Sequence, residues 1–286
     1  MTQLPLLDAH ALIRSDDPTR YPFQPLGPPL EAREREQGIT DAQLLEALDV
    51  NHIERAVLVQ RARLYAYDNR YICDAARLHA TRLQFVCQVD VAERDCAQRV
   101  RDWIARGAVG VRFMEPVKGS DLAWLDGAGA RAAWQIACEQ GVPVSVHFFP
   151  WNRAAGLEIL ARRLKEAPPR ALVLDSLAGT ALETGPPDYG LDEALRAVLG
   201  FAQTHLKFTG MTLARLAAAK LSAEALVARL TAELGAARLL WGSDVLGPGQ
   251  TYAGVVTQMT AATARLSDSD RAQVLHDTAA GLYFLR

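Results

Sequence analysis

The sequence predicts an α/β protein with one domain, a (β/α)8 barrel of the TIM type that spans residues 1–286. Short β-type runs alternate with longer helical runs along the whole chain, which is typical of βαβ units around a parallel sheet. The runs RAVLVQ at 55–60, ALVLD at 171–175 and RLLW at 238–241 are almost continuously apolar, as in parallel strands covered on both faces. Eight such units close most naturally into a barrel. The alternative is an open doubly wound sheet, whose dinucleotide-binding form is disfavoured because no GxGxxG motif follows the first strand.

Eight strands and the helices between them can be placed in order along the chain. The expected strands lie at 4–8 (continuing towards 13), 55–60, 83–89, 109–113, 143–147, 171–175, 205–209 and 238–241. The expected helices lie at about 41–50, 68–79, 93–106, 130–140, 154–166, 192–203 and 223–234, followed by a helical C-terminal stretch. Thr40 is a favourable N-cap for the first helix, in which Leu44 and Leu48 share one face. The proline-rich stretch at 16–29 predicts a long loop.

The composition argues against several classes of partner and location. The formal net charge is -2, and Lys and Arg are spread along the chain, so nucleic acid is not expected to bind. No apolar run is long enough to span a bilayer, and residues 1–8 lack the basic and apolar regions of a signal peptide. The 4 cysteines form no CxxC pair and are expected to be reduced thiols. A cytoplasmic protein without membrane contact is therefore expected.

Polar and titratable residues recur at the expected ends of the strands, where barrel enzymes build their active sites. In chain order they are His10, Gln60, Gln88 or Asp90, Arg112, His147, Asp175 with Ser176, Lys207 or Thr209, and Asp244. A barrel without a site would also have some polar residues there, because its strands end in solvent. The set as a whole indicates a candidate site, although no single member establishes one.

Seven short motifs, in the expected order, resemble those of the amidohydrolase-related (amidohydrolase 2) barrel hydrolases. They are LLDAHALI at 6–13, RAVLVQ at 55–60 with YAYDN at 65–69, GVRF at 110–113, VSVH at 144–147, LVLDSLAG at 172–179, LKFTG at 206–210 and LLWGSD at 239–244. The chain is most similar to the subgroup of fuconolactonase-like and 2-pyrone-4,6-dicarboxylate lactonase-like enzymes. The resemblance covers nearly the whole chain and implies the barrel fold of the metal-dependent hydrolases.

The metal-ligand set of that family is degenerate in this chain. The family's first strand has a His-x-His motif, whose two imidazoles point the same way and reach one metal. Here His10 remains, but Leu12 replaces the second histidine, and Ser176 replaces the histidine that usually follows the sixth strand. His10, His147 and Asp244 remain of the pattern. If a divalent metal such as Zn²⁺ is bound, these three are its expected ligands, with an open position for water.

The resemblance to the lactonases implies a second interpretation, hydrolysis without a cofactor. Asp244 would then be the general base that activates water, while His10 and His147 would polarise the carbonyl or stabilise the oxyanion. Arg112 would bind a substrate carboxylate through its bidentate fork. The predicted function is hydrolysis of a small carboxylic ester or lactone that bears a carboxylate.

Three further residues, Gln60, Tyr67 and Asn69, match the family motif near the mouth of the barrel and are predicted to bind substrate. As residues taken alone they would be ordinary parts of a loop. The other candidates also have structural alternatives. Asp244 could cap the segment that follows it, and Arg112 could form an ion pair with a nearby carboxylate such as Asp90 or Glu115. His147 could be a core histidine whose hydrogen bonds are satisfied, and His10 could be a remnant that is bonded to the backbone.

Two functions from other classes remain open at this point. The chain could be a non-catalytic barrel that binds a ligand or a partner, because two ligand positions of the family are replaced. It could also be a non-oxidative decarboxylase, a chemistry of related barrels that normally needs the metal, so Leu12 disfavours it. Related cytosolic barrels often associate, so a homo-oligomer is compatible with the sequence, which does not identify the substrate.

Overall fold

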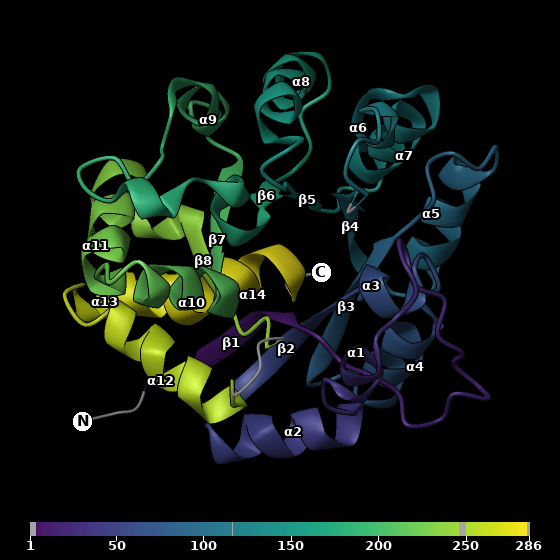
Figure 1. Cartoon of the computed structure of the whole chain (residues 1–286), viewed down its shortest axis with the longest axis horizontal. Helices are drawn as coiled ribbons and strands as arrows, with labels where there is room; N and C mark the ends of the chain where they lie inside the picture. Colours follow the sequence, from purple (N-terminus) through teal and green to yellow (C-terminus); the bar gives the residue numbers. More distant parts are fainter. Residues whose placement is uncertain (1–3, 116, 246–249, 285–286) are drawn as a thin grey trace.

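The computed structural model describes residues 4–115, 117–245 and 250–284, and it confirms the predicted barrel as a single domain. Eight parallel strands form one sheet in the order β1 to β8, and the helices form a ring around it (Figure 1). The strands are β1 Leu6–Ala11, β2 Ile53–Val59, β3 Leu83–Gln88, β4 Ala108–Met114, β5 Val144–His147, β6 Leu172–Leu174, β7 Thr204–Thr209 and β8 Leu239–Gly242. This sequential order contradicts a doubly wound sheet, in which the strand order reverses.

The helices include all those expected from the sequence and several more. They are α1 Ala32–Glu36, α2 Asp41–Val50, α3 Ala62–Tyr65, α4 Arg70–Leu78, α5 Cys96–Ala105, α6 Ala123–Asp126, α7 Ala128–Glu139, α8 Arg153–Glu166, α9 Glu193–Leu199, α10 Gly210–Ala218, α11 Ala223–Leu234, α12 Tyr252–Ala262, α13 Asp268–Ala272 and α14 Thr278–Tyr283. The predicted N-cap Thr40 is confirmed, because its hydroxyl accepts a hydrogen bond from the backbone N–H of Gln43. Helix α10 was not predicted because Thr209 both ends β7 and caps α10, so no loop separates them.

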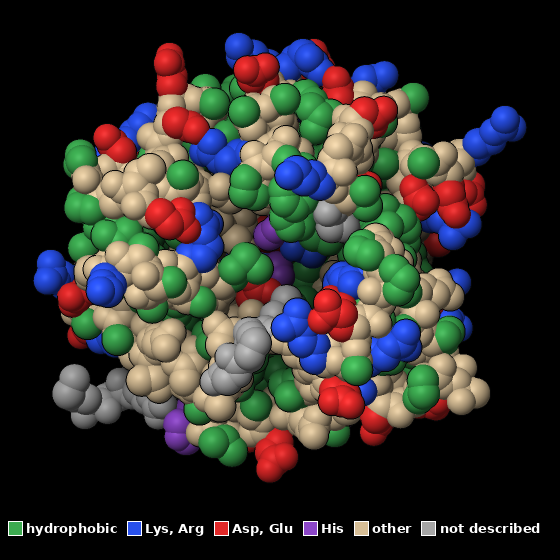
Figure 2. Space-filling model, viewed as in Figure 1, with side chains coloured by type: hydrophobic (Ala, Val, Ile, Leu, Met, Phe, Trp, Pro, Cys, Tyr) green, Lys and Arg blue, Asp and Glu red, His purple; other side chains and the backbone are tan. Residues whose placement is uncertain are grey.

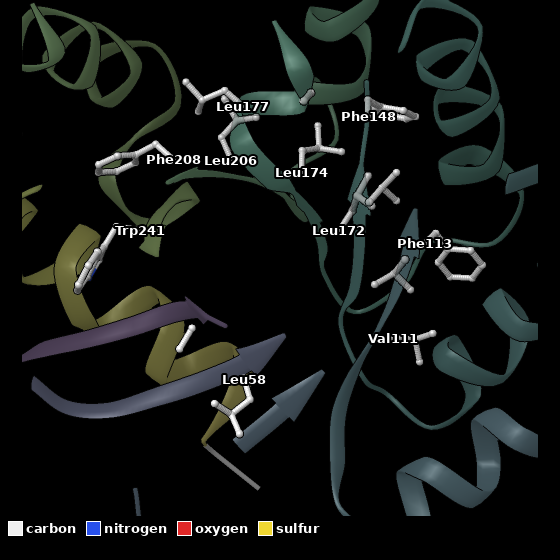
Figure 3. Packing of buried hydrophobic residues seen from close by; sticks show 14 of the residues in the cluster. Leu58, Val111, Phe113, Phe148, Leu172, Leu174, Leu177, Leu206, Phe208 and Trp241 are labelled. Carbon is white, nitrogen blue, oxygen red and sulfur yellow. The ribbon is translucent and has the colours of Figure 1, made fainter. Parts of the chain in front are cut away.

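Side chains along the strands alternate between an apolar outer layer and the barrel interior. Figure 3 shows Leu206 and Phe208 of β7, and Leu172 and Leu174 of β6, in the outer layer, in one hydrophobic cluster with residues of the surrounding helices. Lys207 lies between Leu206 and Phe208 in the chain, so it points into the barrel. The apolar pattern that predicts the strands therefore also determines which residues face the interior.

The start of the barrel is closed by apolar residues. A second cluster, lying towards the strand starts, contains Leu7, Ala9, Val57, Val86, Val109, Val173, Leu240, Ala279 and Tyr283. The last two belong to helix α14, which packs against β1 and β8 and lies near the centre of the helix ring in Figure 1. Because this end is filled, the polar residues at the other end of the strands face a single mouth.

The seam between β1 and β8 is held by a buried carboxylate. Asp8 accepts hydrogen bonds from the backbone N–H groups of His10 (2.9 Å) and Ser243 (2.8 Å). The backbone N–H of Asp244 donates to the carbonyl of His10 over 2.9 Å. Gly242 permits this close approach, since a Cβ there would lie 2.2 Å from the Cβ of His10. The seam thereby fixes His10 and Asp244 next to one another.

The chain leaves β6 one residue earlier than predicted. Asp175 begins a 3-10 turn that ends at Gly179. Within it Ser176, Leu177 and Ala178 have φ of 47°, 55° and 56°, the left-handed region that is unfavourable for residues with a Cβ. Strained backbone of this kind is found at functional sites more often than elsewhere.

In the described ranges no helix combines the length and apolarity that crossing a membrane requires. All four cysteines are free: Cys73, Cys87 and Cys96 are buried and Cys138 is half-buried. Burial raises the pKa of the Cys87 thiol to about 12, so this residue is an unreactive part of the core.

Candidate active site

A hollow opens at the mouth of the barrel. Figure 2 shows it at the centre of the face, with histidine and charged side chains visible inside it. Six side chains, each more than nine-tenths buried, come to this end of the barrel from different strands: His10, Arg112, His147, Asp175, Lys207 and Asp244. The structure thus brings together four residues to which the sequence assigned a role, with Asp175 and Lys207, which were strand-end candidates without an assigned role.

Asp175 is the centre of a buried ion-pair network. Its Oδ2 accepts a hydrogen bond from Arg112 Nε over 2.8 Å, and its Oδ1 lies 3.1 Å from Lys207 Nζ. Burial alone would raise the pKa of Asp175, but the two cations more than offset this and hold the pKa well below its usual range. Burial acts to lower the pKa of Lys207, whereas the Asp175 carboxylate raises it, with a net upward shift. Asp175 and Lys207 are therefore both charged at neutral pH, and the partner of Arg112 is Asp175, not Asp90 or Glu115.

Lys207 also determines which nitrogen of His10 carries the proton. Its ammonium, which can only donate, lies 3.5 Å from His10 Nδ1. Burial, and next the positive charge of Lys207, hold the pKa of His10 well below its usual value, so its imidazole is neutral. With Nδ1 as acceptor, the single proton lies on Nε2, which is 3.8 Å from Asp244 Oδ1. His10 thus directs an N–H group into the space beside Asp244.

Asp244 has no Lys or Arg within ion-pair distance among the described residues. Burial raises its pKa to about 7, although the charge of Arg112 and a hydrogen bond from Thr209 act in the opposite direction. Its φ is 44°, a left-handed conformation that is uncommon outside glycine but several-fold enriched in Asp. A buried carboxylate with a pKa near neutrality, held on unusual backbone, fits the requirements of a general base.

Ser176 and Thr209 connect the strained turn to Asp244. The Oγ of Ser176 lies 3.1 Å from Thr209 Oγ1, and both side chains are buried. Because the Thr209 hydroxyl hydrogen-bonds to Asp244 and lowers its pKa, Thr209 is the donor to the carboxylate. Ser176 must then donate its proton to Thr209. Ser176 is thus a hydrogen-bond donor behind the candidate base.

His147 is a neutral imidazole with one open nitrogen. Burial, and next the charge of Arg112, lower its pKa to about 4. Its Nδ1 is buried and has no hydrogen-bond partner among the described residues. The ring of Phe149 packs edge-on against it, with centroids 4.8 Å apart, and Phe149 in turn stacks on the partly exposed Trp151 at 4.6 Å. These aromatic rings form one wall of the mouth after β5.

The three remaining predicted residues differ in their surroundings. The amide of Gln60 donates to the carbonyls of Ala66 and Asp68, each over 3.0 Å. Asn69 is fully buried, donates to the carbonyls of Tyr67 and Gln88, and accepts from the backbone N–H of Gln88. Gln60 and Asn69 therefore hold the loop after β2.

Tyr67, by contrast, lines two neighbouring cavities of about 370 and 380 Å³, which it shares with Asp90. The phenol ring is partly exposed between them. Of the three residues, Tyr67 is the one that lines cavities, although none of the six buried side chains of the site lines either of them.

The described residues of the site do not fit a divalent metal. No three His, Cys, Asp or Glu side chains come together as a metal-binding group in the ranges that the structure covers. The ammonium of Lys207 lies 3.5 Å from His10 Nδ1 and 3.1 Å from Asp175 Oδ1, between two groups that would otherwise be ligands. A fixed ammonium at this point repels a second cation, and the low dielectric of a buried site strengthens the repulsion.

Two residues near the mouth could not be assigned from the sequence. Lys207 is among the strand-end residues, and the alternation in LKFT places it inward, but nothing in the sequence indicates its contact with Asp175. Arg61, which follows Gln60, is 6% exposed and had no distinguishing signal at all. Lys207 meets Asp175 and His10 from other parts of the barrel, and Arg61 contacts the carbonyl of Gln37 in the loop before α2. A single sequence does not show such contacts.

Comparison with known proteins shows that the chain belongs to the amidohydrolase family, since the family model described as Amidohydrolase matches residues 7–285. No curated protein sequence matches it. Among solved structures, a probable 2-pyrone-4,6-dicarboxylic acid hydrolase from Acinetobacter baumannii with citric acid bound is similar, with a TM-score of 0.73 and 18% identity, covering 97% of this chain and 98% of that one.

Two further structures are similar in fold. An amidohydrolase from Burkholderia multivorans with bound zinc has a TM-score of 0.75 and 20% identity, covering 98% and 99% of the two chains. A 5-carboxyvanillate decarboxylase from Novosphingobium aromaticivorans with bound manganese has a TM-score of 0.66 and 13% identity, covering 99% and 97%. At these identities the likeness shows the fold alone, so the chemistry of this chain depends on its own residues.

Proposed function

We propose that this protein hydrolyses a small carboxylic ester or lactone that carries a carboxylate, with water activated by Asp244 and without a bound metal. The observation that carries the proposal is the buried Asp244, which has no Lys or Arg within ion-pair distance among the described residues and whose pKa burial raises to about 7. A general base is most effective when its pKa lies near the working pH. The family's hydrolase members and the similarity to a pyrone-dicarboxylate hydrolase support the same class of reaction.

The two histidines supply hydrogen-bond donors rather than charge. His10 presents its Nε2 proton beside Asp244, because Lys207 occupies its Nδ1 side. His147 is neutral as well, and its buried Nδ1 has no hydrogen-bond partner among the described residues. Fixed donors directed at a carbonyl oxygen stabilise the negative charge that develops when water attacks. Lys207 and Asp175 act behind His10 as positioning residues.

The reaction balances with these groups alone. Asp244 accepts a proton as the water oxygen bonds to the carbonyl carbon, and the carbonyl oxygen becomes an oxyanion held by His10 and His147. The carbon–oxygen bond of the ester or lactone then breaks. Asp244 returns its proton to the leaving alkoxide, which yields an acid and an alcohol, or a hydroxy acid from a lactone.

Arg112 provides the contact for a substrate carboxylate. Its Nε is engaged by Asp175 over 2.8 Å, while its two terminal nitrogens have no hydrogen-bond partner among the residues that the structure describes. Asp175 thus holds the guanidinium in place and leaves its outer edge for an anion. Tyr67 adds a polar contact near the loop after β2, whereas Gln60 and Asn69 keep that loop in position.

A substrate panel on metal-free protein tests the proposal. The protein is dialysed against a chelator and its metal content is measured, and proton release is then followed with lactones and aryl esters, with and without a carboxylate. We expect turnover of carboxylate-bearing substrates that is unchanged by added zinc. Asp244→Asn should lower kcat by about 10²- to 10⁴-fold. Asp102→Asn, on the exposed side of helix α5, is the control and should keep kcat.

Other outcomes would replace the proposal. Turnover that appears only with stoichiometric zinc would contradict the metal-free mechanism. Carbon dioxide release from an aromatic carboxylate would favour a decarboxylase. No turnover on the whole panel, together with tight binding of small acids, would favour a barrel that only binds.

A further inference from the structure

Arg61 differs from the other buried arginines in having no carboxylate partner. Among the described residues, three arginines are at least nine-tenths buried: Arg61, Arg112 and Arg163. Arg112 pairs with Asp175 at 2.8 Å, and Arg163 lies 3.7 Å from Asp126. No Asp or Glu lies within 4 Å of Arg61 in the described ranges, and residues 1–3, 116, 246–249 and 285–286 include no acidic side chain.

The hydrogen bonds of Arg61 leave most of its guanidinium unused. Nη1 donates to the carbonyl of Gln37 over 2.7 Å. Nε is buried without a partner, and Nη2 has none among the described residues. Burial lowers the pKa of Arg61 to about 10, which still leaves it charged at neutral pH. An unpaired buried guanidinium is costly, and proteins seldom retain one without a use.

A second arginine, Arg14, lies near Arg61, and its charge acts on the Arg61 guanidinium. Arg14 hydrogen-bonds through Nη1 to the carbonyl of Ser15, and its Nε is likewise buried without a partner. Gly38 lies close to both residues: a Cβ added to it would be 2.5 Å from Arg61 Nη1 and 3.4 Å from Arg14 Cβ. The charge of each acts on the hydroxyl of Tyr65, which accepts from the backbone N–H of Ser15. Neither arginine has a carboxylate within 4 Å among the described residues, so this region favours the binding of an anion.

The pair lies at the mouth and on the side of the base. Arg14 follows β1 and Arg61 follows β2, so both are at the strand ends that open to the hollow. β1 lies between β2 and the seam with β8, after which Asp244 is placed. The Asp244 charge reaches Arg61 without forming an ion pair with it.

We propose that Arg14 and Arg61 form an anion-binding site for a small carboxylate at the mouth of the barrel. If the bound carboxylate is part of the substrate, this inference rests on the proposed function and narrows the class of substrate. The substrate is then an ester or lactone with two anionic groups, one bound by Arg112 and one by Arg14 and Arg61. The reacting carbonyl lies between them, next to Asp244.

Binding of non-hydrolysable acids tests this site independently of catalysis. Citrate, succinate and acetate are titrated into the whole protein by calorimetry at constant ionic strength, with chloride and inorganic phosphate as comparison anions. We expect polycarboxylates to bind more tightly than acetate or chloride. Arg61→Met should weaken citrate binding about 10- to 100-fold, the usual effect of losing a charged hydrogen-bonding partner. Arg14→Met should weaken it in the same direction.

Thermal unfolding without added anion distinguishes binding from scaffolding. Arg61→Met removes an unpaired charge, so Tm should stay or rise, whereas the control Arg163→Met leaves Asp126 without a buried partner and should lower Tm while keeping citrate binding. A Tm for Arg61→Met that falls as far as that of Arg163→Met, with citrate affinity kept in Arg61→Met and Arg14→Met, would overturn the proposal. Phosphate that binds more tightly than citrate would overturn the carboxylate assignment. If the protein turns over no substrate of the panel but binds citrate, and Arg61→Met weakens that binding, the proposed hydrolase activity is rejected and the anion site is retained.

Discussion

The two sides of the barrel mouth differ in how their charges are balanced. On the paired side, formed by Arg112, Asp175 and Lys207, every charge has a partner within 3.1 Å. On the unpaired side, formed by Arg14, Arg61 and Asp244, there is no such Arg-to-carboxylate contact among the described residues. Both sides are buried, so the desolvation cost applies to each. The difference indicates that the paired side is a scaffold and the unpaired side is kept for ligand and water.

The largest expected effect is on the paired side. Asp175→Asn leaves the charges of Arg112 and Lys207 without their carboxylate, and breaking a buried pair in this way costs about 3–5 kcal/mol. Urea unfolding at pH 7 measures the loss of stability. If Asp175→Asn unfolds at the wild-type midpoint, the network does not stabilise the fold, and the distinction between the two sides fails.

An Asp-to-Asn substitution on the unpaired side, Asp244→Asn, should raise the free energy of unfolding instead of lowering it. Because the folded-state pKa of Asp244 is raised to about 7, the folded protein holds this proton more tightly than the unfolded chain does. Stability from this group is present below about pH 4 and is lost as the pH rises through 7. Asp244→Asn removes the cost of the buried charge, so it should be more stable than wild type at pH 8 by a few kcal/mol, roughly 4 at most. Equal unfolding midpoints of the two proteins at pH 8 would contradict this.

Lys207 connects the two sides through His10, and its removal should affect catalysis more than binding. Lys207→Met takes away the donor to His10 Nδ1, so the imidazole proton is no longer confined to Nε2. We expect kcat to fall about tenfold, which is less than the loss expected on removing the general base itself, and KM to stay nearly unchanged. Nitrogen NMR of the histidine side chains should show the Nε2–H tautomer of His10 in wild type and a mixture in the variant. A single unchanged tautomer would exclude this role.

The smallest expected effect concerns the hydrogen bonds behind the base. Ser176→Ala removes the donor to Thr209 and weakens the bond from Thr209 that lowers the pKa of Asp244. The pKa of Asp244 should therefore move above about 7, and the rise of kcat/KM with pH should shift to higher pH. Stability should change by only about 1 kcal/mol, the usual net value of one hydrogen bond. A shift to lower pH would reverse the proposed direction of donation.

The fold could be predicted from the sequence because it depends on local pattern. Apolar runs such as that of β8 and the capping residue Thr40 are readable without knowledge of distant contacts. Helix α10 was not predicted because one residue, Thr209, both ends a strand and begins a helix.

The site was less predictable, because its properties arise between strands. The sequence indicated His10, His147, Arg112 and Asp244, but it could not show that Asp175 binds the guanidinium of Arg112 across 63 residues. Nor could it show that Arg61 is buried without an acid. Charge balance depends on which side chains meet, and only the folded structure determines that.

The most direct test is the pH dependence of kcat/KM for a carboxylate-bearing lactone, measured on protein shown to be free of metal. If Asp244 is the unpaired base, kcat/KM should rise with pH along a single ionisation near 7 and then level off, because only the deprotonated carboxylate accepts a proton from water. In Asp244→Asn the residual rate should lose that ionisation. A profile in wild type that is flat between pH 5.5 and 8.5, or activity restored to metal-free protein only by added zinc, would contradict the proposed mechanism.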